Sequence, residues 1–314
     1  MLNAEGIRGR GGQPSPARPG GRGLRRLRDG PWLFLLPAAI YLGATALYPL
    51  YMLVRMALSD VRPINILGTW PYVGLDTFRG VLGSSDFWSA LRVTVYFTGA
   101  LLVLDLGIGF LAALAMRSSR RLGNVALTLM MLVWSLPPIV NGTVWKFMLQ
   151  GDGLINAALQ RVGLPEVVWL GNPGVTLWSL VGVVTWASIP FAATVIRAAL
   201  LGIPPELLEA AAIDGAGRWG SVRHVVLPLL RPVLLVLALL VVVYAFRSFD
   251  FIYVITKGGP GTATTTLPFL AYKQSFQLFN FGTGAATAVA AMAVVIALAA
   301  GYLIASGRGE EELR

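Results

Sequence analysis

The stretch EAAAIDGAGRWGSVRHVVLP, residues 209–228, is a polar interruption in a chain that is otherwise mostly apolar. Hydrophobic residues make up 56% of the 314 residues and charged residues only 13%, yet here a helix-forming run stops at a glycine and basic residues follow. Long apolar segments flank the stretch on both sides. Its composition therefore indicates a short polar helix placed between two membrane spans.

The apolar segments are long enough to cross a bilayer. Five or six of them run past about 18 residues with few ionisable groups, which is the length a transmembrane helix needs. Backbone groups in lipid must be paired within their own segment, so these segments are helices. The sequence predicts an all-α integral membrane protein with spans at about 32–54, 93–116, 125–145, 174–196, 232–254 and 283–305.

Several classes of function are excluded by residues that the sequence lacks. There are no cysteines, so there is no disulfide, thiol nucleophile or zinc–thiolate site. His224 is the one histidine, which is too little for a two-histidine metal site. No G-x-x-x-x-G-K-[ST] run is present, so we expect no ATP-binding P-loop and no cofactor in this chain.

The net charge of +10 follows the positive-inside pattern and does not indicate nucleic-acid binding. Arginines concentrate before the first span, in the 117–124 loop and in the 197–231 segment, and the alternate loops carry fewer basic residues. Both termini and the 197–231 segment are therefore predicted to face the cytoplasm. The arginines of these two loops, read as determinants of topology, are Arg117, Arg120, Arg121, Arg197, Arg218, Arg223 and Arg231.

The N-terminus resembles a signal peptide in part, with a basic tail before an apolar run. That run continues to Val54, which is longer than a typical signal-peptide core, so we expect an uncleaved first span. The predicted organisation is a disordered basic cytoplasmic tail at 1–30, a transmembrane domain at 31–306 and a short cytoplasmic tail at 307–314.

The three predicted external loops, 59–92, 146–173 and 257–282, are too long to be simple connectors. Each mixes turn residues and aromatic residues with one short amphipathic segment. They form either lids over the membrane surface or a docking surface for an external partner.

Polar and helix-breaking residues occur inside the predicted spans. Pro137 and Pro138 break the third span, and a kinked, polar-lined wall is expected there. Arg247 and Asp250 lie three residues apart in the fifth span and are expected to pair, either as a structural pair or as part of a pathway. Asp105 is an isolated charge in the second span, and the sequence assigns it no partner.

The opening stretch predicts a surface helix over residues 205–215. Pro204 and Pro205 suit its first turn, and Gly215, in a left-handed conformation, ends it. A helix that rests on lipid headgroups would carry basic and bulky aromatic residues, whereas this one carries glutamates and alanines. It is therefore expected to dock onto protein. Its apolar stripe is Leu207, Leu208, Ala211 and Ala212.

The spacing of this stretch resembles the EAA loop of membrane subunits of bacterial ATP-binding-cassette importers. Glu209-Ala210-Ala211, Gly215 and Val225-Val226-Leu227-Pro228 carry the pattern. IPPELLEAAAIDGA, KGGP after the fifth span and YVGLDTF at Tyr72–Phe78 resemble the carbohydrate-uptake branch, similar to maltose, glycerol-phosphate and trehalose permeases. The resemblance covers about residues 32–306.

The resemblance implies a MetI-like permease core of five helices, with a peripheral first helix, in the bacterial inner membrane. It also implies a second homologous permease subunit, an ATPase dimer that carries ATP and Mg, an extracytoplasmic solute-binding protein and a sugar substrate. This chain would then be a transport subunit and not an enzyme, surrounded by membrane lipid and without a nucleic-acid partner.

The resemblance further implies two sets of site residues. The coupling helix would contact the ATPase through Glu209, Ala210, Ala211, Asp214, Gly215 and Ala216. The matching substrate-pathway positions are Ser188, Phe191, Tyr244 and Ser248, and the in-span charges Arg247 and Asp250 are added to them.

The identity of the solute stays open at this point. An aromatic face with hydroxyl groups suits a sugar. The amide side chains expected in the fifth span are absent, with Ala245 and Ser248 in their place, which argues against maltose itself. The alternative is a permease for a polyamine, phosphate or a peptide. A secondary transporter would show several in-span acids, and a membrane enzyme would show clustered catalytic groups; neither pattern is seen.

Overall fold

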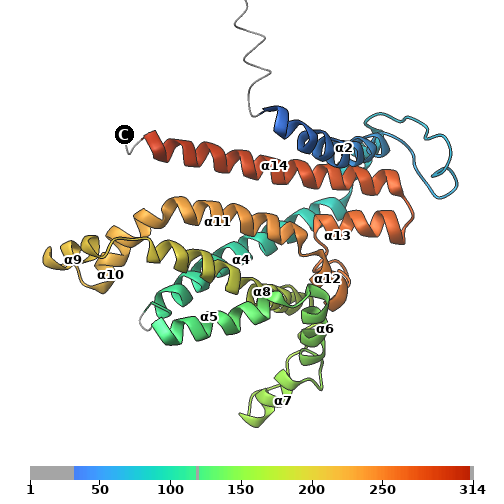
Figure 1. The fold of residues 1–314 in the computed structure, drawn as a ribbon. Helices are drawn as coiled ribbons and strands as arrows, with labels where there is room; N and C mark the ends of the chain where they lie inside the picture. The colour runs from blue at the N-terminus through green and yellow to red at the C-terminus, as the bar shows by residue number, and fades with distance from the viewer. Residues whose placement is uncertain (1–31, 118–119, 312–314) are drawn as a thin grey trace, which may run out of the picture. The chain divides into compact units, whose positions relative to one another are not determined.

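The computed structural model describes residues 32–117 and 120–311 (Figure 1). The predicted tail at 1–30 lies outside the described residues, as do residues 312–314. Two compact units are distinguished, Met1–Met52 and Leu53–Arg314. In the first, the described residues belong to helix α2 (Trp32–Ala57), whose C-terminal end continues into the second.

The second unit is helical throughout its regular structure. Among the described residues, β-type pairing is limited to one isolated antiparallel bridge between Ser59 and Tyr72. The helices that follow α2 are α3 (Asp76–Gly83), α4 (Ser85–Ala115), α5 (Arg120–Ser135), α6 (Pro138–Met148), α7 (Leu154–Arg161), α8 (Pro173–Leu201), α9 (Pro205–Ile213), α10 (Arg218–Ser221), η1 (Val222–Val226), α11 (Leu227–Arg247), α12 (Phe249–Ile255), α13 (Leu267–Tyr272), η2 (Lys273–Gln277) and α14 (Phe281–Glu311).

Among the described residues, five helical segments are long and apolar enough to cross a membrane, and the count reaches six if the bent pair α5–α6 forms one span. The all-α, multi-span prediction is therefore confirmed. In most spans the helices begin or end several residues outside the predicted bounds. Helix α4 begins at Ser85 rather than near residue 93, because the Ser84 side chain accepts a hydrogen bond from the Phe87 N–H and caps it. Helix α14 extends to Glu311, beyond the predicted end at 305.

Helices α4 and α8 form the centre of the second unit, and Figure 1 shows α8 running beside α4 and α11. The two helices approach closely at Gly109, where an added Cβ would lie 2.9 Å from the Cβ of Ala192. Small residues at the contact let the backbones come together, as is usual for helices in membranes. Phe97 and Leu101 of α4 and Ile196 of α8 are fully buried in the core cluster that the two helices share.

The third predicted span is broken at the two prolines. Helix α5 ends at Ser135, α6 begins at Pro138, and their axes differ by 96° (Figure 1). Pro138 occupies the first position of α6, where its missing N–H costs nothing, and it cannot continue α5. The predicted break is confirmed, and α6 turns to pack against α12 through Gly142, where an added Cβ would lie 3.5 Å from Val254.

The fifth predicted span, expected as one helix over 232–254, is divided at Ser248. Helix α11 ends at Arg247 and α12 begins at Phe249, because Ser248 adopts φ −73° and ψ 27°. The Ser248 hydroxyl donates a hydrogen bond of 2.8 Å to the Tyr244 carbonyl, which satisfies an acceptor that the broken helix leaves open. The chain therefore changes direction at the level of this serine.

The segment between α2 and α4 is tied to the start of α14. The Val61 carbonyl accepts hydrogen bonds from the N–H groups of Phe281 and Gly282, at 3.0 and 3.2 Å, and so caps α14. An added Cβ at Gly282 would lie 2.4 Å from the Ser59 carbonyl oxygen, so only glycine allows this approach.

The loop after α12 is ordered by its threonines. Gly258, at φ +83°, lies so close to Phe269 and Thr265 that an added Cβ would be 2.6 and 2.7 Å from their side chains. The Thr265 hydroxyl donates to the Gly258 carbonyl at 3.0 Å, and the Thr264 hydroxyl donates to the Gly259 carbonyl at 2.8 Å. This KGGP loop places α13 against α4, where the Thr94 hydroxyl accepts the Leu267 N–H at 2.9 Å.

We expect Gly284→Ala to destabilise the protein and Gly99→Ala to leave it unchanged or slightly more stable. A Cβ at Gly284 would overlap the Ser275 hydroxyl and lie 2.8 Å from the Ala271 carbonyl oxygen, whereas nothing lies within 4 Å of the position at Gly99. Overpacking of this kind costs about 1–3 kcal/mol. Thermal unfolding in detergent, followed by size-exclusion chromatography, measures the difference, and equal melting temperatures for the two variants would contradict the packing described.

Candidate functional site

A cavity of about 330 Å³ opens where α4, α8 and the two broken spans meet. It is lined by Asp105, Trp134, Pro138, Ser188, Phe191, Ala192, Leu240, Val241, Val243, Tyr244, Arg247 and Asp250. Five of the six substrate-pathway positions expected from the sequence are in this set: Ser188, Phe191, Tyr244, Arg247 and Asp250. The breaks at Pro138 and Ser248 bring α5 and α12 to the same cavity.

One wall of the cavity is aromatic. The rings of Trp134 and Phe191 stack, with centroids 5.9 Å apart and planes 16° from parallel. Tyr244, half-buried, also lines the cavity. The wall expected to be polar at the third span is therefore apolar here, since Trp134 and Pro138 line the cavity while Asn141 is buried in α6 and does not.

The buried polar centre of the cavity is Asp105. Its side chain is fully buried in α4, and its Oδ1 accepts a hydrogen bond of 2.9 Å from the Ser188 hydroxyl of α8. The Ser188 hydroxyl is also 2.8 Å from the Val184 carbonyl. Asp105 Oδ2 is buried without a hydrogen-bond partner among the described residues. A buried carboxylate with a free oxygen is costly, so this atom is ready to accept a hydrogen bond from a molecule in the cavity.

The predicted pair between Arg247 and Asp250 is wrong. The two side chains form no ion pair in the part of the chain that the structure describes, because the break at Ser248 puts them on different helices, α11 and α12. Both instead line the cavity, with Arg247 exposed and Asp250 half-buried. A cation and an anion are thus left available for polar groups of a solute.

Ser248 does not line the cavity. It is buried, and its hydroxyl is engaged with the Tyr244 carbonyl, as described above. Ser248 instead ends α11, and the position of this helix end places Tyr244 and Arg247 at the cavity.

The segment of the opening stretch forms a separate, exposed site. Helix α9 has no buried residue, and its Leu208 packs on the core while Ile213 is 86% exposed. Its C-terminus carries two bonds, from the Gly215 N–H to the Ala212 carbonyl (3.1 Å) and from the Ala216 N–H to the Ala211 carbonyl (2.9 Å). This pattern needs a left-handed residue, and Gly215 has φ +82°. Helix α9 spans Pro205–Ile213, two residues shorter than predicted, and Gly215 follows it in the predicted left-handed conformation. The coupling role stays a prediction for all six residues: Glu209, Ala210, Ala211, Asp214, Gly215 and Ala216.

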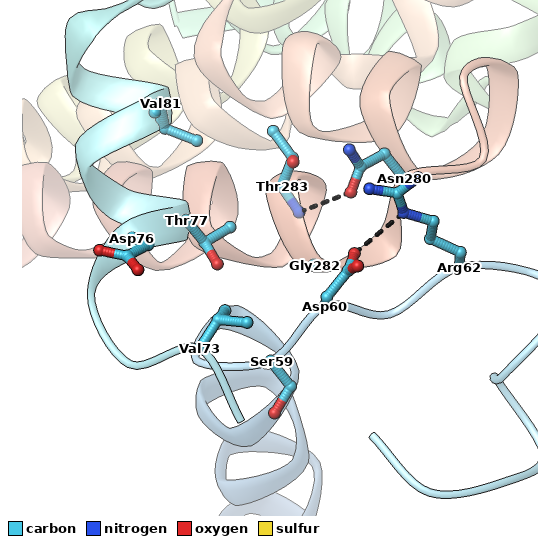
Figure 2. Close-up of a pocket in the computed structure, with 11 residues that line it drawn as sticks. Ser59, Asp60, Arg62, Val73, Asp76, Thr77, Val81, Asn280, Gly282 and Thr283 are labelled. Carbon is cyan, nitrogen blue, oxygen red and sulfur yellow. Dashed lines mark hydrogen bonds and ion pairs between the residues drawn. The ribbon is translucent and has the colours of Figure 1, made fainter. Parts of the chain in front are cut away.

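A second hollow, of about 320 Å³, lies beside the cap of α14 (Figure 2). Asp60 and Arg62 form an ion pair of 3.0 Å on one side, and Asp76 and Thr77 of α3 face it from the other. The Asn280 side chain accepts the Thr283 N–H at 3.2 Å at its base. Its residues come from the first and third predicted external loops, which the structure therefore joins into one polar surface.

The sequence of residues 105–306 matches the family of inner-membrane components of binding-protein-dependent transport systems. The chain belongs to this family. It is accordingly a multi-pass membrane transport subunit of a system that depends on a binding protein, and not an enzyme.

Two curated relatives are permeases of sugar transport systems. The chain is 34% identical to the diacetylchitobiose uptake system permease protein DasB of Streptomyces coelicolor, over 90% of this chain and 88% of the relative. It is 34% identical to the trehalose/maltose transport system permease protein MalF of Thermococcus litoralis, over 77% of this chain and 82% of the relative. A solved chain of a bacterial ABC transporter that imports alginate has the same fold, with a TM-score of 0.77 and 23% identity over 92% of this chain and 98% of that one.

The sequence assigns no role in a site to several residues that line the cavity, of which Trp134 and Asp105 matter most for its chemistry. Trp134 falls within an apolar span, and its place shortly before the Pro-Pro break is the one signal that marks it. Asp105 stands out as an isolated charge, but its partner Ser188 lies 83 residues away, and no spacing rule connects the two.

We expect Tyr244→Ala and Phe191→Ala to lower transport about tenfold or more while the assembled transporter is retained. Each removes an aromatic face from the cavity, and one lost contact with a bound solute is worth about 1–3 kcal/mol. Tyr96→Ala is the matched control, because Tyr96 is 62% exposed on α4 and does not line the cavity. Uptake of radiolabelled solute measures the effect, and equal rates for Tyr244→Ala and Tyr96→Ala would remove Tyr244 from the pathway.

Proposed function

We propose that this chain is a permease subunit of an ATP-driven sugar importer and that the cavity beside Asp105 lies on the path of the sugar. The names of the relatives support it, since those above are permeases for diacetylchitobiose and for trehalose and maltose, and a further one, 30% identical, serves sulfoquinovosyl glycerol in Agrobacterium fabrum.

The single observation that carries the proposal is the pairing of aromatic and polar groups in one cavity. The stacked Trp134 and Phe191 offer a flat apolar face for the C–H face of a sugar ring. Asp105 Oδ2 and the unpaired Arg247 and Asp250 offer acceptors and a donor for hydroxyl groups. A site for a cationic polyamine would carry acidic groups and would not include Arg247. A site for phosphate would carry several hydrogen-bond donors and would not include the carboxylates of Asp105 and Asp250.

The proposal includes an ATPase dimer as a separate subunit pair, which binds ATP and Mg, and a second permease subunit. Helix α9 is the element suited to contact the ATPase. Its exposed face carries Glu206, Glu209 and Ile213, and the Gly215 stop fixes where the chain leaves the helix. Ile213 is 86% exposed and Leu207 is 43% exposed, so α9 offers apolar contact area beside its two glutamates.

The proposal also assigns the polar surface around Asp60, Asp76 and Asn280 to the external side, where a binding protein would dock. The Val61 carbonyl accepts hydrogen bonds from the Phe281 and Gly282 N–H groups, which holds this surface to α14, so a contact there would act directly on a membrane helix.

The proposed function is tested with the complete transporter reconstituted in nanodiscs with its binding protein. We expect ATP hydrolysis to rise when the binding protein is loaded with one sugar and not with a polyamine, phosphate or a peptide. Stimulation by a polyamine, phosphate or a peptide in place of every sugar would establish the alternative solute class.

We expect Gly215→Val to abolish uptake and Gly217→Val to preserve it. Both positions have open space for a side chain, but Gly215 has φ +82° and Gly217 has φ −66°, so only the first is strained by a β-branched residue. Glu209→Lys tests the same contact through charge. The readouts are co-purification of the ATPase and ATP hydrolysis stimulated by the binding protein; full activity in both Gly215→Val and Glu209→Lys would make α9 a surface connector.

We expect reporters fused after Gly123 and Gly217 to be cytoplasmic and a reporter fused after Gly153 to be external. The distribution of arginines is the reason, since both termini and the segment around α9 are assigned to the cytoplasm. Paired alkaline phosphatase and green fluorescent protein fusions measure the sidedness, and the reverse pattern at any of the three positions would refute this orientation.

A further inference from the structure

Arg197 is a buried cation without an anionic partner. Only 8% of the residue is exposed, it lies in the last turns of α8, and neither of the two ion pairs found among the described residues includes it. Among the described residues its one hydrogen bond runs from Nη2 to the Asn124 Oδ1 of α5, at 2.7 Å, and its Nε is buried without a partner among them. An amide oxygen carries no net charge, so the guanidinium remains uncompensated, which is costly for a buried ion.

The surroundings of Arg197 form a cavity of about 410 Å³ at the ends of α4, α5 and α8. Arg117, exposed after the end of α4, is a second cation on its wall, and none of the described residues that line it is acidic. Asn124 also lines the cavity, and the remaining described lining residues are apolar: Ala113, Met116, Leu200 and Leu201. Two arginines and an apolar wall at the end of membrane helices match the headgroup region of a bilayer.

The cavity is built by a close contact between helices. An added Cβ at Gly123 would lie 2.3 Å from the Met116 carbonyl oxygen and 3.3 Å from Arg197 Nη2, so the start of α5 lies against the end of α4 and against the guanidinium. Arg197 is thereby held in place before any ligand arrives. Guanidinium groups held in this way bind phosphate oxygens through paired, charge-assisted hydrogen bonds.

We propose that Arg197 and Arg117 form a binding site for a phosphate group, carried by the headgroup of an anionic phospholipid or present as a free phosphate. The site lies in α8 just before the Gly202–Pro204 connection to α9, so its occupancy would bear on the position of α9. The apolar wall favours the phospholipid, whose acyl chains would continue along α4 and α8. The inference does not depend on which solute the transporter carries.

The test uses the complete transporter in nanodiscs of phosphatidylcholine, with phosphatidylglycerol or inorganic phosphate added in separate arms. Thermal stability and native mass spectrometry report binding. We expect a rise in melting temperature and a retained phosphatidylglycerol in the wild type, and apparent affinity about tenfold or more weaker in Arg197→Gln. A response to inorganic phosphate that Arg197→Gln also abolishes would assign the site to the free anion.

Three further variants keep the test decisive if Arg197→Gln does not fold. Asn124→Asp supplies a carboxylate at the atom that Arg197 already contacts, and we expect it to weaken binding as strongly without loss of the fold. Arg117→Gln should weaken binding to a smaller degree. Arg121→Gln is the matched control, because Arg121 is exposed in the same turn of α5 as Asn124 and does not line the cavity.

The proposal is overturned if neither ligand acts differently on the wild type and Asn124→Asp. It is also overturned if Arg197→Gln and Asn124→Asp leave lipid and phosphate binding unchanged but release the ATPase or the second permease subunit, since Arg197 would then be paired by a partner's carboxylate.

Discussion

The contact between α4 and α8 at Gly109 and Ala192 is the constraint on which the rest of the second unit depends. An added Cβ there would lie 2.9 Å from its neighbour, so the two helices are as close as small residues permit. At that separation a short serine on α8 reaches Asp105 on α4, at 2.9 Å. At the other end of the contact, Arg197 is held against the start of α5. The cavity beside Asp105 and the cavity beside Arg197 are thus both set by the same helix pair.

Two broken spans convert a packed bundle into one with a cavity. Membrane helices tolerate breaks where neighbouring groups satisfy the backbone atoms that the break releases. At Pro138 the missing N–H falls in the first turn of a new helix, and at Ser248 a hydroxyl takes up the Tyr244 carbonyl. Residues beside both breaks line this cavity, Trp134 and Pro138 at the first and Arg247 and Asp250 at the second. Local backbone chemistry therefore creates the space in which a solute could bind.

The charged residues within the spans divide by what surrounds them. Asp105 is partly satisfied by a serine, Arg247 and Asp250 meet the cavity unpaired, and Arg197 is buried with an amide only. Since an unpaired charge in a membrane protein is costly, each marks a place where a ligand or partner supplies the missing group. For Asp105, Arg247 and Asp250 we assign that group to the transported solute, and for Arg197 to a phosphate.

Much of the fold could be predicted from patterns within a few neighbouring residues. Length and hydropathy placed the spans, Pro137 and Pro138 placed the break between α5 and α6, and the spacing from Glu209 to Gly215 placed α9 with its left-handed stop, because each depends on neighbours a few residues away. The tertiary structure decided the rest. The bond between Asp105 and Ser188 joins residues 83 positions apart, and Trp134 meets Phe191 only because α5 packs on α8. The sequence alone made Arg197 a marker of topology and Arg247 the partner of Asp250. In the structure Arg197 is buried, and the break at Ser248 separates Arg247 from Asp250, so both assignments change. Burial of a side chain and the direction of a helix depend on how the helices pack, which a sequence pattern does not specify.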